Sequence, residues 1–268
     1  MAVHNENTLG ERRFGRINWL GMATLARRET RRFVVVWTQT LLAPLVTAAL
    51  FLAIFSVAIG PTRGDIAGVP FLHFLAPGIL MMTVIQNAFA NTSSSIVVSK
   101  VQGNIVDTLM PPLSALELLL GYMAGSVVRG MMVAVAIGLG MLFFLGIEIQ
   151  HPIWALVFVF LGSSMMGAVG IVAGIYSNKF DQMAAITNFI VTPLAFLSGT
   201  FYTIDTLPPL IQTITRANPV YYLIDGARYG VIGHTQTPWL GLVVCTAATL
   251  AVMALCWVWF AKGYRLKA

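Results

Sequence analysis

The sequence predicts an all-α membrane protein with six transmembrane helices and both termini in the cytoplasm. Three observations carry this prediction: the composition, six long apolar segments, and the distribution of basic residues. Of the 268 residues, 57% are apolar and 10% are charged, whereas about a quarter of an ordinary soluble domain is charged. The roughly 153 apolar residues suffice for six spans of about 20 residues each. This composition excludes a soluble enzyme, a disordered chain and a disulfide-rich scaffold.

Residues 1–38 are expected to form a cytoplasmic tail followed by an amphipathic helix at the membrane interface. Residues 1–16 are polar, and no signal peptide is expected because the first long apolar run starts near Gln39. In 17–34, one helical face carries Trp19, Met22, Ala26 and Phe33, and the opposite face carries Arg27, Arg28, Arg31 and Arg32. This pattern predicts arginines that point toward anionic lipid headgroups. The alternative is a charged segment that only stops translocation.

Residues 39–268 are expected to form one permease domain with six spans. The apolar segments lie at about 39–59, 72–97, 113–145, 153–176, 183–201 and 239–261, and each is near or above the length that a bilayer requires. The third segment is long enough to project into the cytoplasm at its start. The fifth is interrupted by Pro193 and Gly199.

The basic residues predict the orientation of these spans. With the N-terminus inside, twelve Lys and Arg residues fall on the cytoplasmic side and three, Arg63, Arg216 and Arg228, fall outside. The twelve are Arg12, Arg13, Arg16, Arg27, Arg28, Arg31, Arg32, Lys100, Lys179, Lys262, Arg265 and Lys267. Such a split is the positive-inside pattern. It accounts for the net charge of +6 without a nucleic-acid partner.

The outer stretch from 202 to 238 is too short to cross the membrane twice. Leu207, Leu210, Ile211 and Ile214 recur at helical spacing, which is typical of a short helix with one apolar face. A second short apolar stretch, 220–232, contains Asp225 and Arg228. We expect two short re-entrant helices that pack on the protein.

Several kinds of chemistry are missing from the sequence. It has no G-x-x-x-x-G-K-[ST] motif for binding ATP, and no histidine pattern suited to a metal ion. No Asp or Glu lies in the middle of a span, which disfavours a proton-driven carrier. Arg129 is the one full charge deep in a span. It either contacts an anionic substrate or a gating partner, or makes a structural hydrogen bond.

Two segments resemble those of a known family. The first runs Pro193-Leu-Ala-Phe-Leu-Ser-Gly-Thr-Phe201, reaches Leu207-Pro208, and continues as Asn218-Pro-Val-Tyr-Tyr-Leu-Ile-Asp-Gly-Ala-Arg228. The second is Met110-Pro-Pro-Leu-Ser-Ala-Leu-Glu-Leu-Leu-Leu-Gly121. Both resemble ABC type-2 export permeases, the membrane subunits of ATP-binding-cassette exporters of polysaccharides, lipo-oligosaccharides, lipids and drugs. One departure is Tyr202, where many relatives have proline.

The resemblance implies a homodimer in the bacterial inner membrane with two copies of a separate ABC ATPase subunit. The chain itself would be a transporter subunit and not an enzyme, would bind no cofactor, and would leave ATP and Mg to the ATPase. The resemblance assigns coupling to the ATPase to Lys100, Val101, Gln102, Gly103, Asn104, Asp107, Arg27 and Arg28. It assigns an outer gate to Ser198, Gly199, Phe201, Asn218, Pro219, Tyr222, Asp225 and Arg228.

A pathway or interface role is expected for Arg129, Gln86 and Asn87. Two alternatives remain open: an ATP-independent channel or secondary carrier, and a membrane-embedded enzyme or scaffold. The substrate is not predicted, because the 29 aromatic residues serve equally well in cores and membrane belts.

Overall fold

The computed structural model describes residues 17–58, 60, 64–66, 68–233 and 238–266. Over these ranges the chain is almost entirely helical, and the only extended pairing is one bridge between Ile66 and Val69. The predicted all-α class is confirmed. The expected tail 1–16, with Arg12, Arg13 and Arg16, lies outside the described residues, as do Arg63 and Lys267.

Five helices in the described ranges are long and apolar enough to cross a membrane. The first spans Thr38–Ala58 and consists of a π-helical turn, η1 (Thr38–Leu42), followed by α2 (Ala43–Ala58). The others are α3 (Phe71–Val101), α5 (Ala115–Leu145), α6 (Pro152–Tyr176) and α11 (Trp239–Lys262). They correspond to five of the six predicted apolar segments.

The predicted fifth segment, 183–201, is helical only to Phe196. It begins as α7 (Phe180–Ile186), continues through a π-helical turn η2 (Thr187–Val191), and ends as α8 (Thr192–Phe196). The helix expected over 197–201 is wrong, because the chain turns there and Gly199 has a positive φ of 71°. The turn η2 ends two residues before Pro193, whose ring nitrogen cannot donate to a regular helical ladder. That this segment crosses the membrane stays a prediction.

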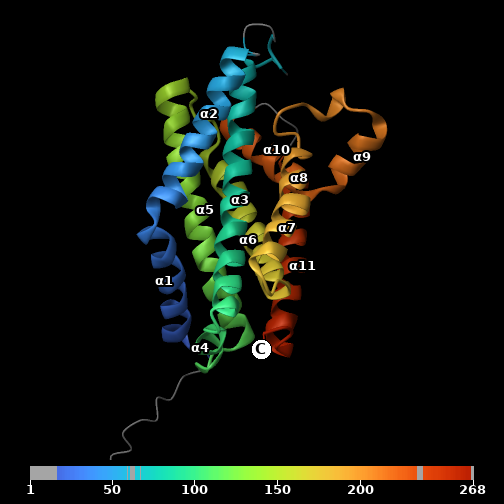
Figure 1. Cartoon of the computed structure of the whole chain (residues 1–268). Coiled ribbons are helices and arrows are strands. Elements are labelled where there is room, and N and C mark those ends of the chain that lie inside the picture. The colour runs from blue at the N-terminus through green and yellow to red at the C-terminus, as the bar shows by residue number, and fades with distance from the viewer. Residues whose placement is uncertain (1–16, 59, 61–63, 67, 234–237, 267–268) are drawn as a thin grey trace, which may run out of the picture.

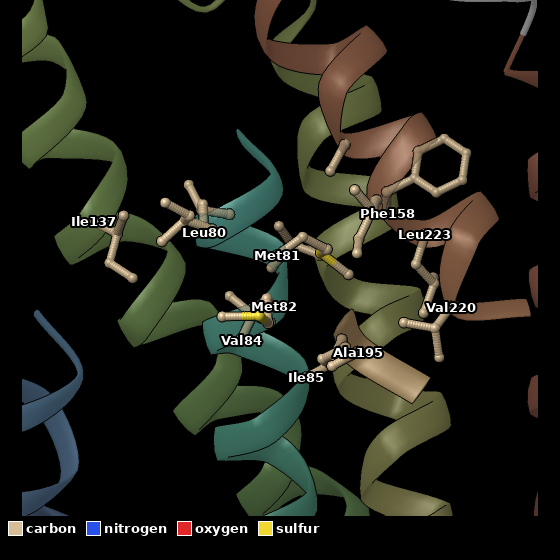
Figure 2. Close-up of a cluster of buried hydrophobic side chains, with 14 of the residues drawn as sticks. Leu80, Met81, Met82, Val84, Ile85, Ile137, Phe158, Ala195, Val220 and Leu223 are labelled. Atoms are coloured by element: carbon tan, nitrogen blue, oxygen red, sulfur yellow. The ribbon is translucent and has the colours of Figure 1, made fainter. Parts of the chain in front are cut away.

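Helix α3 forms the centre of the bundle. Its most apolar window is 83% buried, whereas that of Thr38–Ala58 is 6% buried. Figure 2 shows side chains of α3 between Ile137 of α5 on one side and Phe158 of α6 with Leu223 of α10 on the other. A side chain at Gly170 of α6 would put its Cβ 2.5 Å from the Phe89 carbonyl oxygen, so glycine permits the close contact between α3 and α6.

The two ends of the bundle carry different short helices (Figure 1). One end, which we call the α4 end, carries α1 (Trp19–Val35), α4 (Ile105–Leu109) and the last turns of α11. The opposite end, the α9 end, carries η3 (Ile204–Thr206), α9 (Pro209–Ala217) and α10 (Pro219–Ile232). Helix α9 projects from the bundle, whereas α10 packs against α3, α6 and α11. The two short helices expected in the stretch 202–238 are therefore present.

Candidate functional site

Helix α1 is fastened to α5 where both helices begin. The Asn18 side chain caps α1 by accepting the Gly21 N–H at 2.9 Å. The backbone N–H of Asn18 donates to Glu117 at 2.6 Å, and the same carboxylate accepts the Ser114 N–H at 2.7 Å in the capping box of α5. One carboxylate therefore anchors the first turns of two helices that are far apart in the sequence.

Two glycines of α5 allow α1 to approach closely. A Cβ at Gly121 would lie 2.6 Å from Leu25 Cδ2, and a Cβ at Gly125 would lie 2.6 Å from Glu29 Cβ. Contacts this short essentially never occur for real side chains. The absence of side chains at these positions therefore sets the distance between the helices.

Glu29 is the buried polar centre of α1. Its side chain has no solvent exposure, and its Oε1 accepts hydrogen bonds from Ser95 Oγ at 2.9 Å and Arg28 NH2 at 3.0 Å. Its Oε2 lies 3.6 Å from Arg32 Nε. A buried carboxylate is costly unless such partners surround it. Glu29 was not among the predicted site residues, although it stands four residues from both Leu25 and Phe33 on the buried face.

The expectation that all four arginines of α1 face lipid headgroups is wrong for two of them. Arg28 donates to Thr108 Oγ1 of α4 at 2.8 Å, and Arg32 donates to the Asn91 carbonyl of α3 at 2.5 Å. Burial lowers the pKa of Arg32, and the nearby Glu29 carboxylate opposes that shift. Arg27 and Arg31 remain exposed, and the Arg28 side chain is still 45% accessible despite its contacts. Glu29 accounts for the contacts of Arg28 and Arg32, because its carboxylate lies 3.0 and 3.6 Å from their guanidinium groups.

The apolar face predicted for α1 also differs from the observed one. Trp19 is 65% exposed, whereas Leu25 is buried with Phe33 against the bundle. Figure 1 shows α1 alongside α5, and the two helices pack extensively. The helical pattern of α1 could not predict that α1 packs on α5, because α5 lies about a hundred residues further along the chain.

The predicted coupling residues between α3 and α5 divide into fixed and exposed groups. Lys100 is fixed, because its Nζ donates to the Ile175 and Ser177 carbonyls at the end of α6, at 2.7 and 2.8 Å. The exposed group consists of Val101, Gln102, Gly103, Asn104 and Asp107. Since Arg28 bonds Thr108, the structure brings the coupling residues of α1 close to α4.

A groove of about 320 Å³ lies between α1 and the connection from α4 to α5. Its walls include Leu20, Thr24, Asp107 and Pro111. Large apolar side chains are exposed at this end, with Leu20 60% and Met110 76% accessible. Large apolar side chains exposed beside a groove are a feature of protein-interaction sites.

Asn218 connects the end of α8 to α10. Its Nδ2 donates to the Leu194 carbonyl at 3.0 Å and to Ser198 Oγ at 2.9 Å. Its Oδ1 accepts the Val220 N–H at 3.0 Å, which caps α10. Pro219 occupies the first turn of α10, where its missing N–H costs nothing. The Asn-Pro pair therefore starts α10 and fixes it to the preceding turn.

Arg228 fastens α10 to two other elements. It is 4% exposed, and it donates to the Phe74 carbonyl of α3 at 3.3 Å and to the Gly199 carbonyl at 2.9 Å. Its guanidinium lies 3.8 Å from the centre of the Phe74 ring, a favourable cation–π arrangement. The structure thus brings Ser198, Gly199, Asn218 and Arg228 together around the turn that follows α8.

The other predicted outer residues lie around this junction. Phe201 packs on Phe55 and Phe51 of α2, with ring centres 5.3 and 6.1 Å apart. Tyr222 and Asp225 are half-buried on α10. Their role in a gate stays a prediction.

Arg129 has a hydrogen-bond partner within the bundle. Its NH2 donates to Asn87 Oδ1 of α3 at 2.8 Å, and Asn87 in turn donates to the Thr83 carbonyl at 2.9 Å. Arg129 Nε is buried and has no hydrogen-bond partner among the described residues. Gln86 is half-buried. Arg129 therefore links α5 to α3, and a pathway role for it, Gln86 and Asn87 stays a prediction.

The family described as "ABC-2 type transporter" matches residues 21–232, from the first turn of α1 to the end of α10. The "Inner membrane transport permease YadH" of Escherichia coli K12 is 32% identical over 251 residues, which cover 93% of this chain and 98% of that protein.

Two more distant relatives match a similar length. The "Daunorubicin resistance ABC transporter permease protein DrrB1" of Streptomyces coeruleorubidus is 25% identical over 232 residues, covering 83% of this chain and 78% of that protein. "Nodulation protein J" of Neorhizobium galegae is 22% identical over 226 residues, covering 82% of this chain and 83% of that protein. The similarity therefore includes both ends of the bundle.

Proposed function

Because this chain belongs to the ABC-2 type transporter family and is the permease-type membrane subunit of an ABC transporter, we propose that it is half of an ATP-driven exporter. Two copies form the translocation pathway, and each copy is coupled to a separate ATPase subunit. The sequence has no P-loop, so the energy comes from that partner. In this arrangement the α4 end is cytoplasmic and the α9 end faces outward.

The observation that carries the coupling proposal is the contact between α1 and α4. Movement of α4 reaches α1 through the bond from Arg28 to Thr108. It reaches α3 through Glu29, which binds both Arg28 and Ser95. An ATPase bound in the groove between α1 and the α4–α5 connection therefore acts on the central helix α3 through direct contacts. Such packed interfaces switch between discrete arrangements when they are displaced.

The least buried helices are the proposed contact with the second copy. Only 6% of the most apolar window of Thr38–Ala58 is buried, and α7 has no buried residue. Lipid covers such surfaces equally well, so cross-linking is required to identify the interface. Phe189 of η2 is 81% exposed, and the native Cys245 and Cys256 are both buried. We expect Phe189→Cys to cross-link between copies, with the unmodified chain as the control.

The outer residues support a gate at the α9 end. Asn218 and Arg228 hold α10 to α3 and to the end of α8, which makes α10 a fixed wall. Helix α9 makes few contacts with the rest of the chain. We propose that α9 and α10 from the two copies close the pathway on the outer side.

Copurification with the ATPase tests the function directly. The tagged full-length chain, expressed in its host, is expected to retain an ABC ATPase subunit with ATP-hydrolysing activity. Val106→Asp combined with Met110→Asp should abolish retention, because both side chains are exposed at the α4 end. Leu210→Asp combined with Ile214→Asp on α9 is the matched control, since it places the same two charges at exposed apolar positions of the opposite end. Failure to retain any ATPase, or ATP-independent transport, would overturn the proposal.

A further inference from the structure

An apolar groove lies between α5, α6 and α10, in the half of the bundle that contains the α9 end. Its volume is about 420 Å³, within the range of small-molecule sites. Each helix contributes a pair of residues four positions apart, which share one helical face: Ala134 and Gly138 of α5, Ala155 and Val159 of α6, and Ala227 and Val231 of α10. The residues from α10 are at most 3% exposed and form part of the floor. Small side chains on all three helices therefore leave the groove open.

The groove has the length of one lipid leaflet. On α5 it is lined from Met131 to Leu142, a stretch of helix roughly 16 Å long. The hydrocarbon core of a bilayer is about 30 Å thick, so one leaflet accounts for about half of that distance. The rim carries the apolar side chains Val135, Leu139 and Leu156, each about half exposed. A single acyl chain that lies along α5 therefore fits the groove.

One carboxylate stands at the end of this groove. Glu148 lines the groove and is exposed, and it forms no ion pair with another described residue. The connection that carries it is fixed to the last turns of α10. The Gln150 N–H donates to the Val231 carbonyl at 3.1 Å, and the His151 N–H donates to the Gly230 carbonyl at 2.8 Å. Glu148 is therefore held where the headgroup of a lipid in the groove would lie.

The charge and the lining discriminate among lipid headgroups. A primary ammonium group offers three hydrogen-bond donors to a carboxylate. A quaternary ammonium group offers none and is typically bound by aromatic rings, whereas no described aromatic side chain lines this groove. An anionic headgroup would be repelled by Glu148, since no described basic side chain lines the groove either. Charge complementarity therefore favours phosphatidylethanolamine over phosphatidylcholine and phosphatidylglycerol.

A second copy of the chain fits the groove less well than a lipid. The proposed contact between copies uses the span Thr38–Ala58 and α7, and neither contributes a described residue to the groove. A second copy seated here would also bury Glu148, which is costly unless a cation is supplied to it.

We propose that the groove between α5, α6 and α10 binds one phosphatidylethanolamine molecule, with an acyl chain along α5 and the ammonium group on Glu148. The lipid belongs to the leaflet at the α9 end. Its chain packs on Ala227 and Val231, and so adds contacts to the helix that Arg228 fastens to α3. The inference goes beyond the proposed function, because it concerns a resident lipid and not the cargo.

Native mass spectrometry of the full-length chain in detergent tests this inference. Dioleoyl phosphatidylethanolamine, phosphatidylcholine and phosphatidylglycerol are titrated separately, and the bound lipids are counted. We expect phosphatidylethanolamine to bind at least about tenfold more tightly than the other two. Glu148→Gln should remove this preference. Asp205→Asn should retain it, because this matched control removes an exposed carboxylate at the same end but outside the groove.

Two leucine variants locate the bound lipid. Gly138→Leu fills the proposed groove, whereas Gly140→Leu places the same side chain in a separate apolar groove between α2 and α5. A Cβ at either glycine meets nothing within 4 Å, so both variants should keep the packing of the bundle. We expect Gly138→Leu to weaken phosphatidylethanolamine binding about tenfold or more, and Gly140→Leu to leave it unchanged.

Three results would overturn the inference. Equal affinities for the three lipids would exclude recognition by Glu148. Equal effects of the two leucine variants would place the lipid outside this groove. Dissociation of a dimer by Gly138→Leu, with unchanged lipid binding, would assign the groove to a second copy. None of these measurements involves an ATPase, so the proposed function stands or falls separately, by copurification.

Discussion

Gly125→Ala is expected to loosen α1 from the bundle. The added Cβ would lie 2.6 Å from Glu29 Cβ and 3.0 Å from Asn91 Nδ2. Ordinary contact begins at 3.4 Å, so α1 must move by at least about 0.8 Å. Glu29 Cβ is fixed to the backbone of α1, so no side-chain rotation relieves the contact. Overpacking of this kind typically costs about 1–3 kcal/mol.

Limited trypsin digestion measures the loosening, because Arg27 and Arg31 are exposed on α1 but need local unfolding for cleavage. If cleavage follows the open population, about 1–3 kcal/mol corresponds to roughly 5- to 150-fold faster cleavage. Gly121→Ala should have a smaller effect, since its nearest neighbour is the flexible end of Leu25.

Gly140→Ala is the matched control in the same helix, because a Cβ there meets nothing within 4 Å. It should leave cleavage unchanged or slow it slightly through the better helix propensity of alanine. Equal cleavage rates for the Gly125 and Gly140 variants would refute the argument that glycine sets the α1–α5 distance.

Three further predictions concern single side chains. Asn218→Ala should lower the free energy of unfolding of the detergent-solubilised protein by about 1–3 kcal/mol, because three hydrogen bonds are lost. Asn178→Ala should leave this free energy unchanged, because the Asn178 side chain makes no described hydrogen bond. The effects of Arg129→Ala and Asn87→Ala on the free energy of unfolding should differ from their sum by at least about 0.5 kcal/mol in a double-mutant cycle, because the two side chains share a hydrogen bond. Additive effects would show that this bond does not couple the two residues. Lys100→Ala should lower the melting temperature, because the Ile175 and Ser177 carbonyls lose their donor, whereas Gln102→Ala should leave it unchanged; equal melting temperatures would exclude the structural role.

The sequence predicts those features that depend on local composition. Five long helices are recognisable because each segment is apolar over the whole thickness of a bilayer. The caps at Ser114 and Asn218 were not predicted, although both use residues within three positions of the cap. The fifth segment was predicted too long, because Phe201 is apolar but packs in an aromatic cluster with α2 after the chain has turned.

The features that the sequence did not predict depend on distant contacts. Glu29 is buried only because Gly125 of α5 and Ser95 of α3 meet it. The contacts of Arg28 with α4 and of Arg32 with α3 follow from that burial. Arg228 was expected near the outer gate, but its partners, the Phe74 and Gly199 carbonyls, are backbone groups that no side-chain pattern reveals.

The shared anchor at Glu117 has a consequence for how the protein is made. Asn18 leaves the ribosome 99 residues before the carboxylate that holds it, and domains assemble as synthesis proceeds from the N-terminus. While the first span inserts, the arginines of α1 do not yet have their partners in α3 and α4. In the proposed orientation they would then serve as the retention signal on the cytoplasmic side. Glu29 is buried only once α5 has arrived. The proposed orientation therefore gives this cationic segment two successive roles, a topological signal during insertion and a part of the packed bundle afterwards.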